Sequence, residues 1–257
     1  MGSINGMNLR EQMHEWVSKS PDAIADQYLA FVDYAWHRTT DKDYFDPRNL
    51  DAFVIRGGLV GESGELAEEI KKGIRSRGVK WHPLDLVLEI GDVLFYLSCA
   101  ALRYGDAETI EQVRGVIRDW SKGQPDGYTR TIHQLAEALP FDPHSDRAWS
   151  TRSLHLDMLG RAEDVAFAAT QLAISIRNGF HWHNNARAEK AIDTTLIVCA
   201  MLKLAELGAM LHVHFRDLFV LNAAKVIERD SKSGITVIDA FDRMVEALRP
   251  RYLKVPG

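Results

Sequence analysis

The sequence has 257 residues, 46% of them hydrophobic, which is enough to bury a sizeable core in one large domain or two small ones. Its net charge is −5 and it has no cluster of basic residues, so a protein that coats nucleic acid is excluded. A small nucleotide bound through a metal ion is compatible with that charge. Because prolines number only 8 and β-branched runs are few, the chain is expected to be helical.

No uncharged apolar run reaches the roughly 18 residues of a membrane helix, and no secretory signal precedes the first predicted helix. The sequence therefore predicts a cytoplasmic protein that does not enter a membrane. Its two cysteines, Cys99 and Cys199, each lie in an apolar helical run. We expect buried thiols in a reducing compartment rather than a disulfide.

The first part of the chain contains one predicted helix between two irregular segments. Residues 1–22 begin MGSINGMNL, which is typical of a flexible leader or tag. Residues 22–38 carry apolar side chains at helical spacing and predict an amphipathic helix. The next segment, TTDKDYFDPRN, is rich in turn-forming residues and is broken by Asp46-Pro47.

The central feature of the sequence is the stretch 59–103, which contains two pairs of carboxylates spaced i, i+3. The first pair is Glu62 and Glu65, and the second is Glu89 and Asp92. At this spacing both members of a pair point to the same side of a helix. The two pairs are therefore candidates for one shared site between two neighbouring helices.

The second pair lies in the run LDLVLEIGDVLFYLSCAAL, which is apolar nearly all round a helix and is predicted to be buried. Buried carboxylates need a compensating partner, and no basic residue lies within one turn of Glu89 and Asp92. If the two helices pack antiparallel, four hard oxygen ligands converge, which suits Mg²⁺ or Mn²⁺. The alternative is a solvated run of glutamates on the first helix, matched by Lys71 and Lys72. The buried second pair favours the metal site.

The second half of the chain repeats the first at an offset of 101 positions, which suggests a duplication. The corresponding positions include Glu62 with Glu163, Gly78 with Gly179, Trp81 with Trp182, His82 with His183 and Asp92 with Asp193. In this alignment Glu65 corresponds to Ala166 and Glu89 to Lys190, so the second copy is not expected to hold a metal. We expect 181–183, which reads HWH, to be a structural loop that packs its Trp rather than a transition-metal site, since histidines at i, i+2 do not share a helix face.

The letters GLVGESGELAEEIKK followed by LEIGDVLFYL resemble the ExxE…ExxD signature of the MazG-like, all-α nucleoside triphosphate pyrophosphohydrolases. The resemblance extends over about 45 residues and includes small residues and lysines as well as the acids. It implies Mg²⁺-dependent hydrolysis of a nucleotide between its α- and β-phosphates. It also implies that the metal ligands are Glu62, Glu65, Glu89 and Asp92.

Proteins of that family commonly dimerise into a four-helix bundle, and here both halves would come from one chain. The resemblance thus implies an all-α helical bundle in which a tandem repeat forms a covalent pseudo-dimer, with further pairing into a homodimer of pseudo-dimers left open. The predicted divisions are an intact repeat at 23–130, a degenerate repeat at 131–235, and a C-terminal helix and tail at 236–257.

The resemblance also suggests residues that bind substrate. Asn222-Ala-Ala-Lys225, with Arg229 after it, is similar to the family's downstream N-x-x-K element, which contacts phosphate or metal-bound water. Lys72, at the end of the first acidic helix, either complements the helix dipole or meets a phosphate. Trp36 is a candidate for stacking on the base, as are Tyr44 and Phe45 in the following loop.

The sequence therefore predicts a nucleotide pyrophosphohydrolase that converts an NTP or dNTP to a monophosphate and diphosphate. Metal held by the four acids would activate water, with Glu62 or Glu65 orienting it or accepting its proton. Two alternatives stay open at this point. One is an enzyme similar to phosphoribosyl-ATP pyrophosphohydrolase, and the other is a nucleotide sensor without catalysis.

Overall fold

The computed structural model describes residues 17, 20–39, 47–75, 83–122, 147–183, 192–210 and 213–231, and every regular element in those ranges is an α-helix. The helices are α2 (Pro21–Thr39), α3 (Pro47–Arg75), α4 (Pro83–Tyr104), α5 (Ala107–Lys122), α7 (Arg147–His183), α8 (Thr195–Met210) and α9 (Phe215–Ser231). The predicted all-α fold class is confirmed. Taken singly, none of these described helices has both the length and the apolar character needed to cross a membrane.

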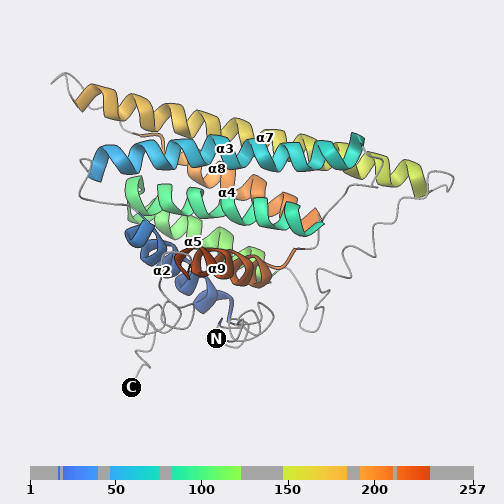
Figure 1. The fold of residues 1–257 in the computed structure, drawn as a ribbon, viewed down its shortest axis with the longest axis horizontal. Helices are drawn as coiled ribbons and strands as arrows, with labels where there is room; N and C mark the ends of the chain where they lie inside the picture. The colour runs from blue at the N-terminus through green and yellow to red at the C-terminus, as the bar shows by residue number, and fades with distance from the viewer. Residues whose placement is uncertain are drawn as a thin grey trace.

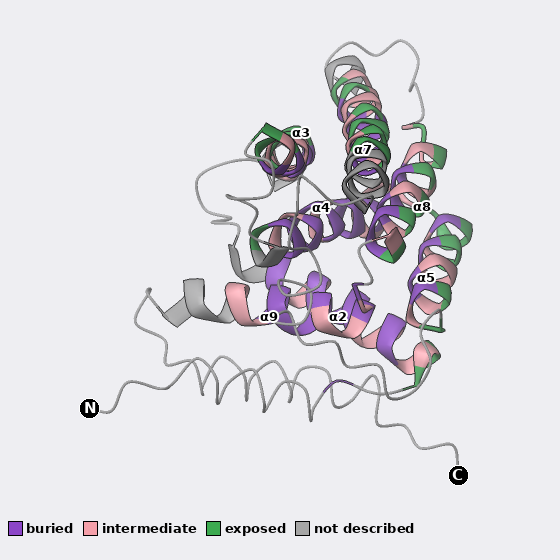
Figure 2. Cartoon of the chain, turned by 90° about the vertical axis from the view of Figure 1, so that its right-hand side faces the viewer, coloured by how far each residue is buried: buried purple, intermediate pink, exposed green. Residues whose placement is uncertain are grey.

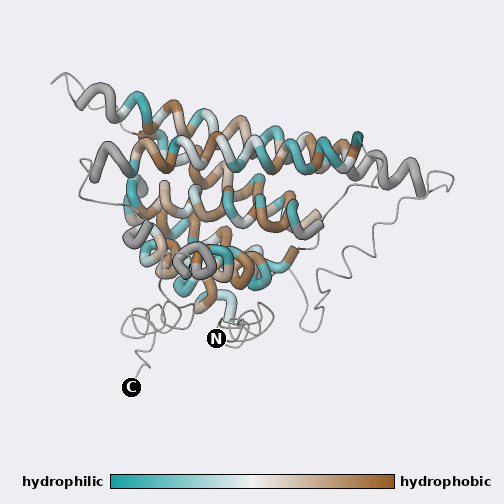
Figure 3. The backbone as a smooth tube through the Cα atoms, viewed as in Figure 1, coloured by the Kyte–Doolittle hydropathy of each residue, from teal (hydrophilic) through white to brown (hydrophobic). Residues whose placement is uncertain are grey.

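Helix α4 lies at the centre of the molecule (Figures 1 and 2). On one side, α3, α7 and α8 pack with α4 in a ring, and on the other side α2, α5 and α9 cover it. Figure 2 shows α4 largely buried, as its apolar sequence predicts. Figure 3 shows hydrophobic and hydrophilic residues mixed along α3 and α7, the two outer helices, because each has only one side toward the core.

The directions of the helices follow from the colours of Figure 1. Helices α3 and α4 run in opposite directions, and α7 runs opposite to α3. Helix α7 packs on α3, and α8 packs on α7 and α4. These are the neighbours expected if α7 and α8 correspond to α3 and α4. The tandem repeat and its divisions at 23–130 and 131–235 stay predictions.

Local chemistry sets where several helices begin. Helices α3 and α4 each start at a proline, Pro47 and Pro83, whose missing N–H is one that a first helical turn leaves unbonded anyway. Asp106 caps α5, because its Oδ1 accepts hydrogen bonds from the backbone N–H of Thr109 at 2.8 Å and from the Thr109 hydroxyl at 2.7 Å.

A buried aromatic cluster fixes α9 on α2. The Tyr28 ring meets the rings of Phe215 and Phe219 edge-on, with centroids 5.1 and 5.2 Å apart. Phe31 contacts Phe219 at 5.5 Å, and all four rings are almost completely buried. Aromatic pairs of this kind contribute about 0.5–1.5 kcal/mol each beyond their buried area. This packing sets the register of α9 and thereby places the turn at Asn222 against α4.

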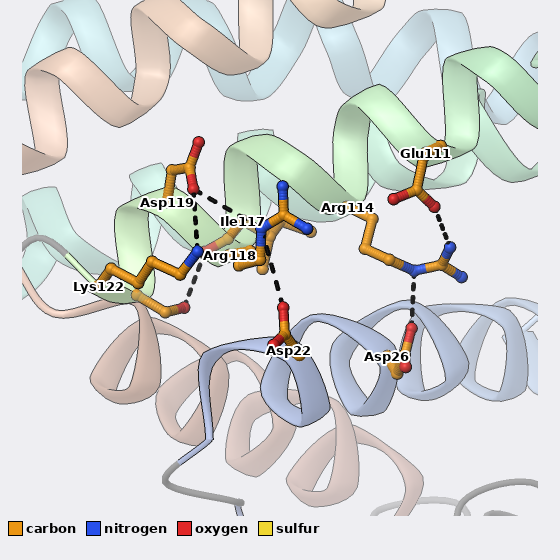
Figure 4. Close-up of polar contacts among 9 residues, drawn as sticks. Asp22, Asp26, Glu111, Arg114, Ile117, Arg118, Asp119 and Lys122 are labelled. Atoms are coloured by element: carbon orange, nitrogen blue, oxygen red, sulfur yellow. Dashed lines mark hydrogen bonds and ion pairs between the residues drawn. The ribbon is translucent and has the colours of Figure 1, made fainter.

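Ion pairs on the surface hold α5 to α2 (Figure 4). The Arg114 Nε lies 2.7 Å from Asp26 Oδ1, and the guanidinium also pairs with Glu111. Arg118 lies 3.8 Å from Asp22. Exposed pairs of this kind are worth about 0–1 kcal/mol each, so the buried residues of α5, which include Val113 and Ile117, contribute more to its packing than these pairs do.

Gly208 should be intolerant of alanine. A Cβ at this position would lie 2.0 Å from Cζ2 of Trp120, whose indole N–H donates to the Val213 carbonyl at 3.1 Å. Because Trp120 cannot move without losing that bond, we expect Gly208→Ala to lower the free energy of unfolding by about 1–3 kcal/mol. Gly160→Ala is the control, since no atom lies within 4 Å of its added Cβ, and it should stabilise α7 by about 0.5–1 kcal/mol. Urea unfolding of both variants measures this, and equal stability of the two would contradict it.

Two expectations about the second half are wrong. Cys99 is buried as predicted, but Cys199 is exposed on α8, where Leu202, three residues on, is also exposed. Residues 181–183, predicted as a loop, form the last turn of α7. The predicted C-terminal helix in 236–257 and most of the leader at 1–22 lie outside the described residues.

Candidate metal centre

Helices α3 and α4 bring three carboxylates together. Glu62 of α3 and Glu89 and Asp92 of α4 each offer one oxygen, and these three oxygens lie within 4.8 Å of one another. The three carboxylates come together because α3 and α4 pack antiparallel and the carboxylates lie on the sides of the helices that face each other. The buried residues of α3 include Leu59 and Leu66, which flank Glu62 and hold that side of α3 toward the core.

The carboxyl of Glu89 is strongly perturbed by its surroundings. Burial, followed by the negative charge of Asp92, raises its pKa from the ordinary value of 4.5 to about 7. The charges of Glu65 and Glu62 add smaller contributions in the same direction, whereas Lys225 lowers the pKa. The Oε2 atom of Glu89 is buried and has no hydrogen-bond partner among the described residues. A buried oxygen without a partner is costly, so this atom needs a proton or a cation.

Asp92 is the most buried carboxylate of the group, with 7% of the residue exposed. Both of its oxygens contact α9, which is distant in the sequence. The Asn222 Nδ2 donates to Oδ1 at 3.4 Å, and the Lys225 ammonium pairs with Oδ2. Gly91 lies beside Asn222, since an added Cβ there would lie at an ordinary contact distance of 3.5 Å from the Asn222 amide nitrogen. The two halves of the chain therefore meet at Asp92.

The donor set fits a hard divalent cation. All three ligands are carboxylates, and oxygens at ligand distances of about 2.0–2.1 Å on opposite sides of Mg²⁺ are separated by roughly 4 Å. The three oxygens lie within 4.8 Å of one another, so only small side-chain movements are needed. Two buried oxygen atoms, Glu89 Oε2 and Asn222 Oδ1, accept no hydrogen bond from any described residue. Hence Glu62, Glu89 and Asp92 are the residues suited to hold the ion.

Glu65 does not join this group. The sequence predicts four carboxylates in one pocket, but the structure brings together three, and Glu65 is exposed on α3. Its charge still acts on Glu89, whose pKa it helps to raise. Glu65 therefore borders the centre from the solvent side. The rest of the glutamate run follows the solvated alternative, since Glu68 pairs with Lys71 and Glu69 with Lys72.

The other predicted substrate residues are differently placed. Lys72 is half exposed and is paired with Glu69, and Trp36 is 3% exposed with its indole N–H donating to Asp51 Oδ1 at 3.1 Å. Trp36 therefore packs in the core and has no face available for a base. Arg229 lies on α9, but its side chain falls outside the described residues, as do Tyr44 and Phe45.

The contact between Lys225 and Asp92 was not predicted from the sequence. The N-x-x-K resemblance implies that this lysine meets phosphate, whereas in the structure its ammonium pairs with a predicted metal ligand. The available signal was the i, i+3 spacing of Asn222 and Lys225, which places both on one side of a helix. A second contact that was not predicted lies one turn beyond Asp92 on α4, where the Tyr96 ring packs on Gly58 of α3. A Cβ added at Gly58 would lie 2.3 Å from this ring.

Fold and site together define an all-helical protein with a carboxylate cluster suited to a divalent cation. Comparison with protein families adds a match over part of the chain. Residues 54–118 match the family described as the MazG nucleotide pyrophosphohydrolase domain, which confirms the resemblance seen in the sequence. The matched segment contains all four predicted acids, and Asn222 and Lys225 lie beyond it. Searches of curated proteins and of solved structures find no match to the chain.

Proposed function

We propose that this protein is a Mg²⁺-dependent nucleotide pyrophosphohydrolase that converts an NTP or dNTP and water to a nucleoside monophosphate and diphosphate. The observation that carries the proposal is the meeting of Glu62, Glu89 and Asp92 within 4.8 Å, inside the segment that matches the MazG domain. Asp92 is buried, and the buried Oε2 atom of the partly buried Glu89 lacks any partner among the described residues. Such a costly arrangement favours a functional over a structural role.

Each residue has a separate task in the proposed reaction. Glu62, Glu89 and Asp92 would hold the cation, with Mn²⁺ as an alternative to Mg²⁺. When bound, the ion supplies Lewis acidity toward phosphate oxygens and lowers the pKa of nearby water. Glu65 is exposed and lies outside the group of three, so its carboxylate is suited to orient the attacking water and accept its proton.

The positive charge for the reaction would come from the second half. Lys225 and Asn222 reach the centre from α9, and Lys225 is partly exposed, so its ammonium is suited to neutralise charge that develops on the phosphates. Arg229 is the other candidate on this helix. Lys72 is less suited because it pairs with Glu69 away from the three carboxylates.

We also propose that the second half serves mainly to complete the core. Helices α7 and α8 cover the faces of α3 and α4, as a partner subunit would in a dimer. At the positions that correspond to Glu65 and Glu89, the second half has Ala166 and Lys190, so it lacks the ligands for a second centre. One metal centre per chain follows from this arrangement.

Purified protein incubated with Mg²⁺ and a panel of NTPs and dNTPs should release diphosphate, and EDTA should stop the release. Glu65→Gln should lower kcat by about 10²–10⁴-fold, since a positioned general base contributes that much. Glu68→Gln is the matched control, because Glu68 lies on the same helix and pairs with Lys71. Its rate should equal that of wild type.

The same panel separates the alternative functions. Release of diphosphate from phosphoribosyl-ATP alone would assign the protein to that substrate instead. Binding of nucleotide and Mg²⁺ without release from any substrate would make it a sensor and would overturn the proposed hydrolysis. Equal rates for wild type and Glu65→Gln would remove Glu65 from the mechanism.

A further inference from the structure

The two oxygens of Asp92 are both in contact with α9, although Asp92 is also a proposed metal ligand. Asn222 donates to Oδ1, and the ammonium of Lys225 pairs with Oδ2. The side chain of Asp92 is 10% exposed, so few water molecules can share this charge. Lys225 thus supplies the positive charge that the cluster of carboxylates lacks in the absence of a metal ion.

An ammonium and a divalent cation cannot both stay beside the same carboxylate without strong repulsion. Within a few Å of each other in a partly buried site, where water screens charge weakly, their repulsion exceeds that of the same charges in water. Together, Lys225 and Asn222 also occupy both oxygens of Asp92, so a metal ion must compete with one of these contacts. A divalent ion and the Lys225 ammonium therefore compete for Asp92, and binding of one displaces the other.

The two α9 residues differ in their ability to move. Asn222 is 3% exposed and lies against Gly91, so it is fixed by packing. The side chain of Lys225 is 27% exposed and ends a flexible four-carbon stem, so its ammonium can swing toward solvent without any movement of α9. Asn222 would keep Asp92 oriented while Lys225 leaves.

We propose that Lys225 is a resident counter-cation that holds Asp92 until a divalent ion displaces it, after which its ammonium is available to the nucleotide phosphates. This inference rests on the proposed function, because it takes Asp92 as a metal ligand. It adds competition between lysine and metal to that function. Metal alone must expel the lysine, whereas metal and nucleotide together give the lysine a new anionic partner. Metal and nucleotide should therefore bind cooperatively, each strengthening the other by the same factor.

Calorimetric titration with Mn²⁺ in the absence of nucleotide tests the competition. We expect Lys225→Met to bind Mn²⁺ about 10-fold more tightly than wild type, within the 5–150-fold range of typical coupling between sites. Lys225→Arg keeps the charge and should bind as wild type does. Lys203→Met is the matched control, since Lys203 also pairs with acids between helices but on α7 and α8, and its affinity should not change. Lys225→Gln provides a second neutral variant if the methionine variant unfolds.

A second titration, in the presence of a non-hydrolysable NTP, tests the cooperativity. Wild type should bind Mn²⁺ about 10-fold more tightly with the nucleotide than without it, and most of this gain should be lost in Lys225→Met. Equal or weaker Mn²⁺ binding by both neutral variants without nucleotide would overturn the inference while leaving the proposed function intact. Absence of Mn²⁺ binding to wild type with and without nucleotide would overturn the proposed function, and the inference with it.

Discussion

Asp92→Asn is expected to lower kcat/KM for diphosphate release by at least about 10³-fold. A preorganised group that stabilises transition-state charge contributes about 10²–10³-fold, and loss of a metal ligand also removes the ion. Asp92 of α4 lies beside Glu62 of α3 and is also contacted by Asn222 and Lys225 of α9. Asparagine has nearly the same shape, so the change removes a charge and leaves the packing intact. Release of diphosphate and Mn²⁺ titration measure the two consequences separately.

Asp164→Asn is the control for this substitution. Asp164 is an exposed acid of α7 that lies 3.8 Å from Lys203 and 3.9 Å from Arg161. It takes no part in the proposed centre, so the variant should hydrolyse substrate at the rate of wild type. Asp92→Asn protein that keeps its circular dichroism and still turns over at more than a tenth of the wild-type rate would show that the centre lies elsewhere.

The architecture of the site was predictable because its helices have distinct patterns. The run around Glu89 and Asp92 is apolar nearly all round, and α4 is indeed central and covered on both sides. A buried helix that carries two acids predicts a compensating partner on another helix. Glu62 of α3 provides part of the site, and the partner of Asp92 comes from α9.

The position of Glu65 was not predictable from spacing alone. Residues three apart on a helix differ by roughly 60° around its axis, because each residue turns the helix by about 100°. Glu62 lies beside the buried side of α3 and faces α4, so a further rotation of this size carries Glu65 to solvent. The i, i+3 spacing predicts that both glutamates lie on the same side of α3, but only the packing of α3 on α4 decides which of them joins the carboxylate cluster.

Two other outcomes depend on contacts that one segment cannot reveal. Helix α8 is apolar, which predicts burial of Cys199, but its neighbours leave uncovered the side that carries Cys199 and Leu202. Lys225 reaches Asp92 because the rings of Tyr28, Phe215 and Phe219 set the register of α9. A change in that aromatic packing would move Lys225 with no change in its own sequence motif.

Glu89→Gln is expected to stabilise the metal-free protein above pH 7 while abolishing metal binding. The pKa of Glu89 is about 7 in the folded chain against an ordinary value of 4.5. Because the folded state holds this proton more tightly than the unfolded state, the carboxyl destabilises the fold progressively as pH rises from about 4.5 to 7. Because the side chain is only partly buried, water screens part of this effect, and the penalty above pH 7 is about 1–2 kcal/mol. Glutamine carries no ionisable group, so it avoids this penalty and can donate hydrogen bonds from the buried position.

Urea unfolding in EDTA at pH 5 and pH 8 measures the effect. The gain of Glu89→Gln over wild type should be small at pH 5 and about 1–2 kcal/mol at pH 8. Glu68→Gln is the contrasting control, since the Lys71 side chain lowers the pKa of Glu68 and its removal should bring no gain at pH 8. Addition of Mn²⁺ should raise the melting temperature of wild type and leave that of Glu89→Gln unchanged. A Glu89→Gln protein that is less stable than wild type at pH 8 in EDTA would mean that Glu89 is stabilised there by a partner other than a metal ion, and the centre would lose its buried ligand.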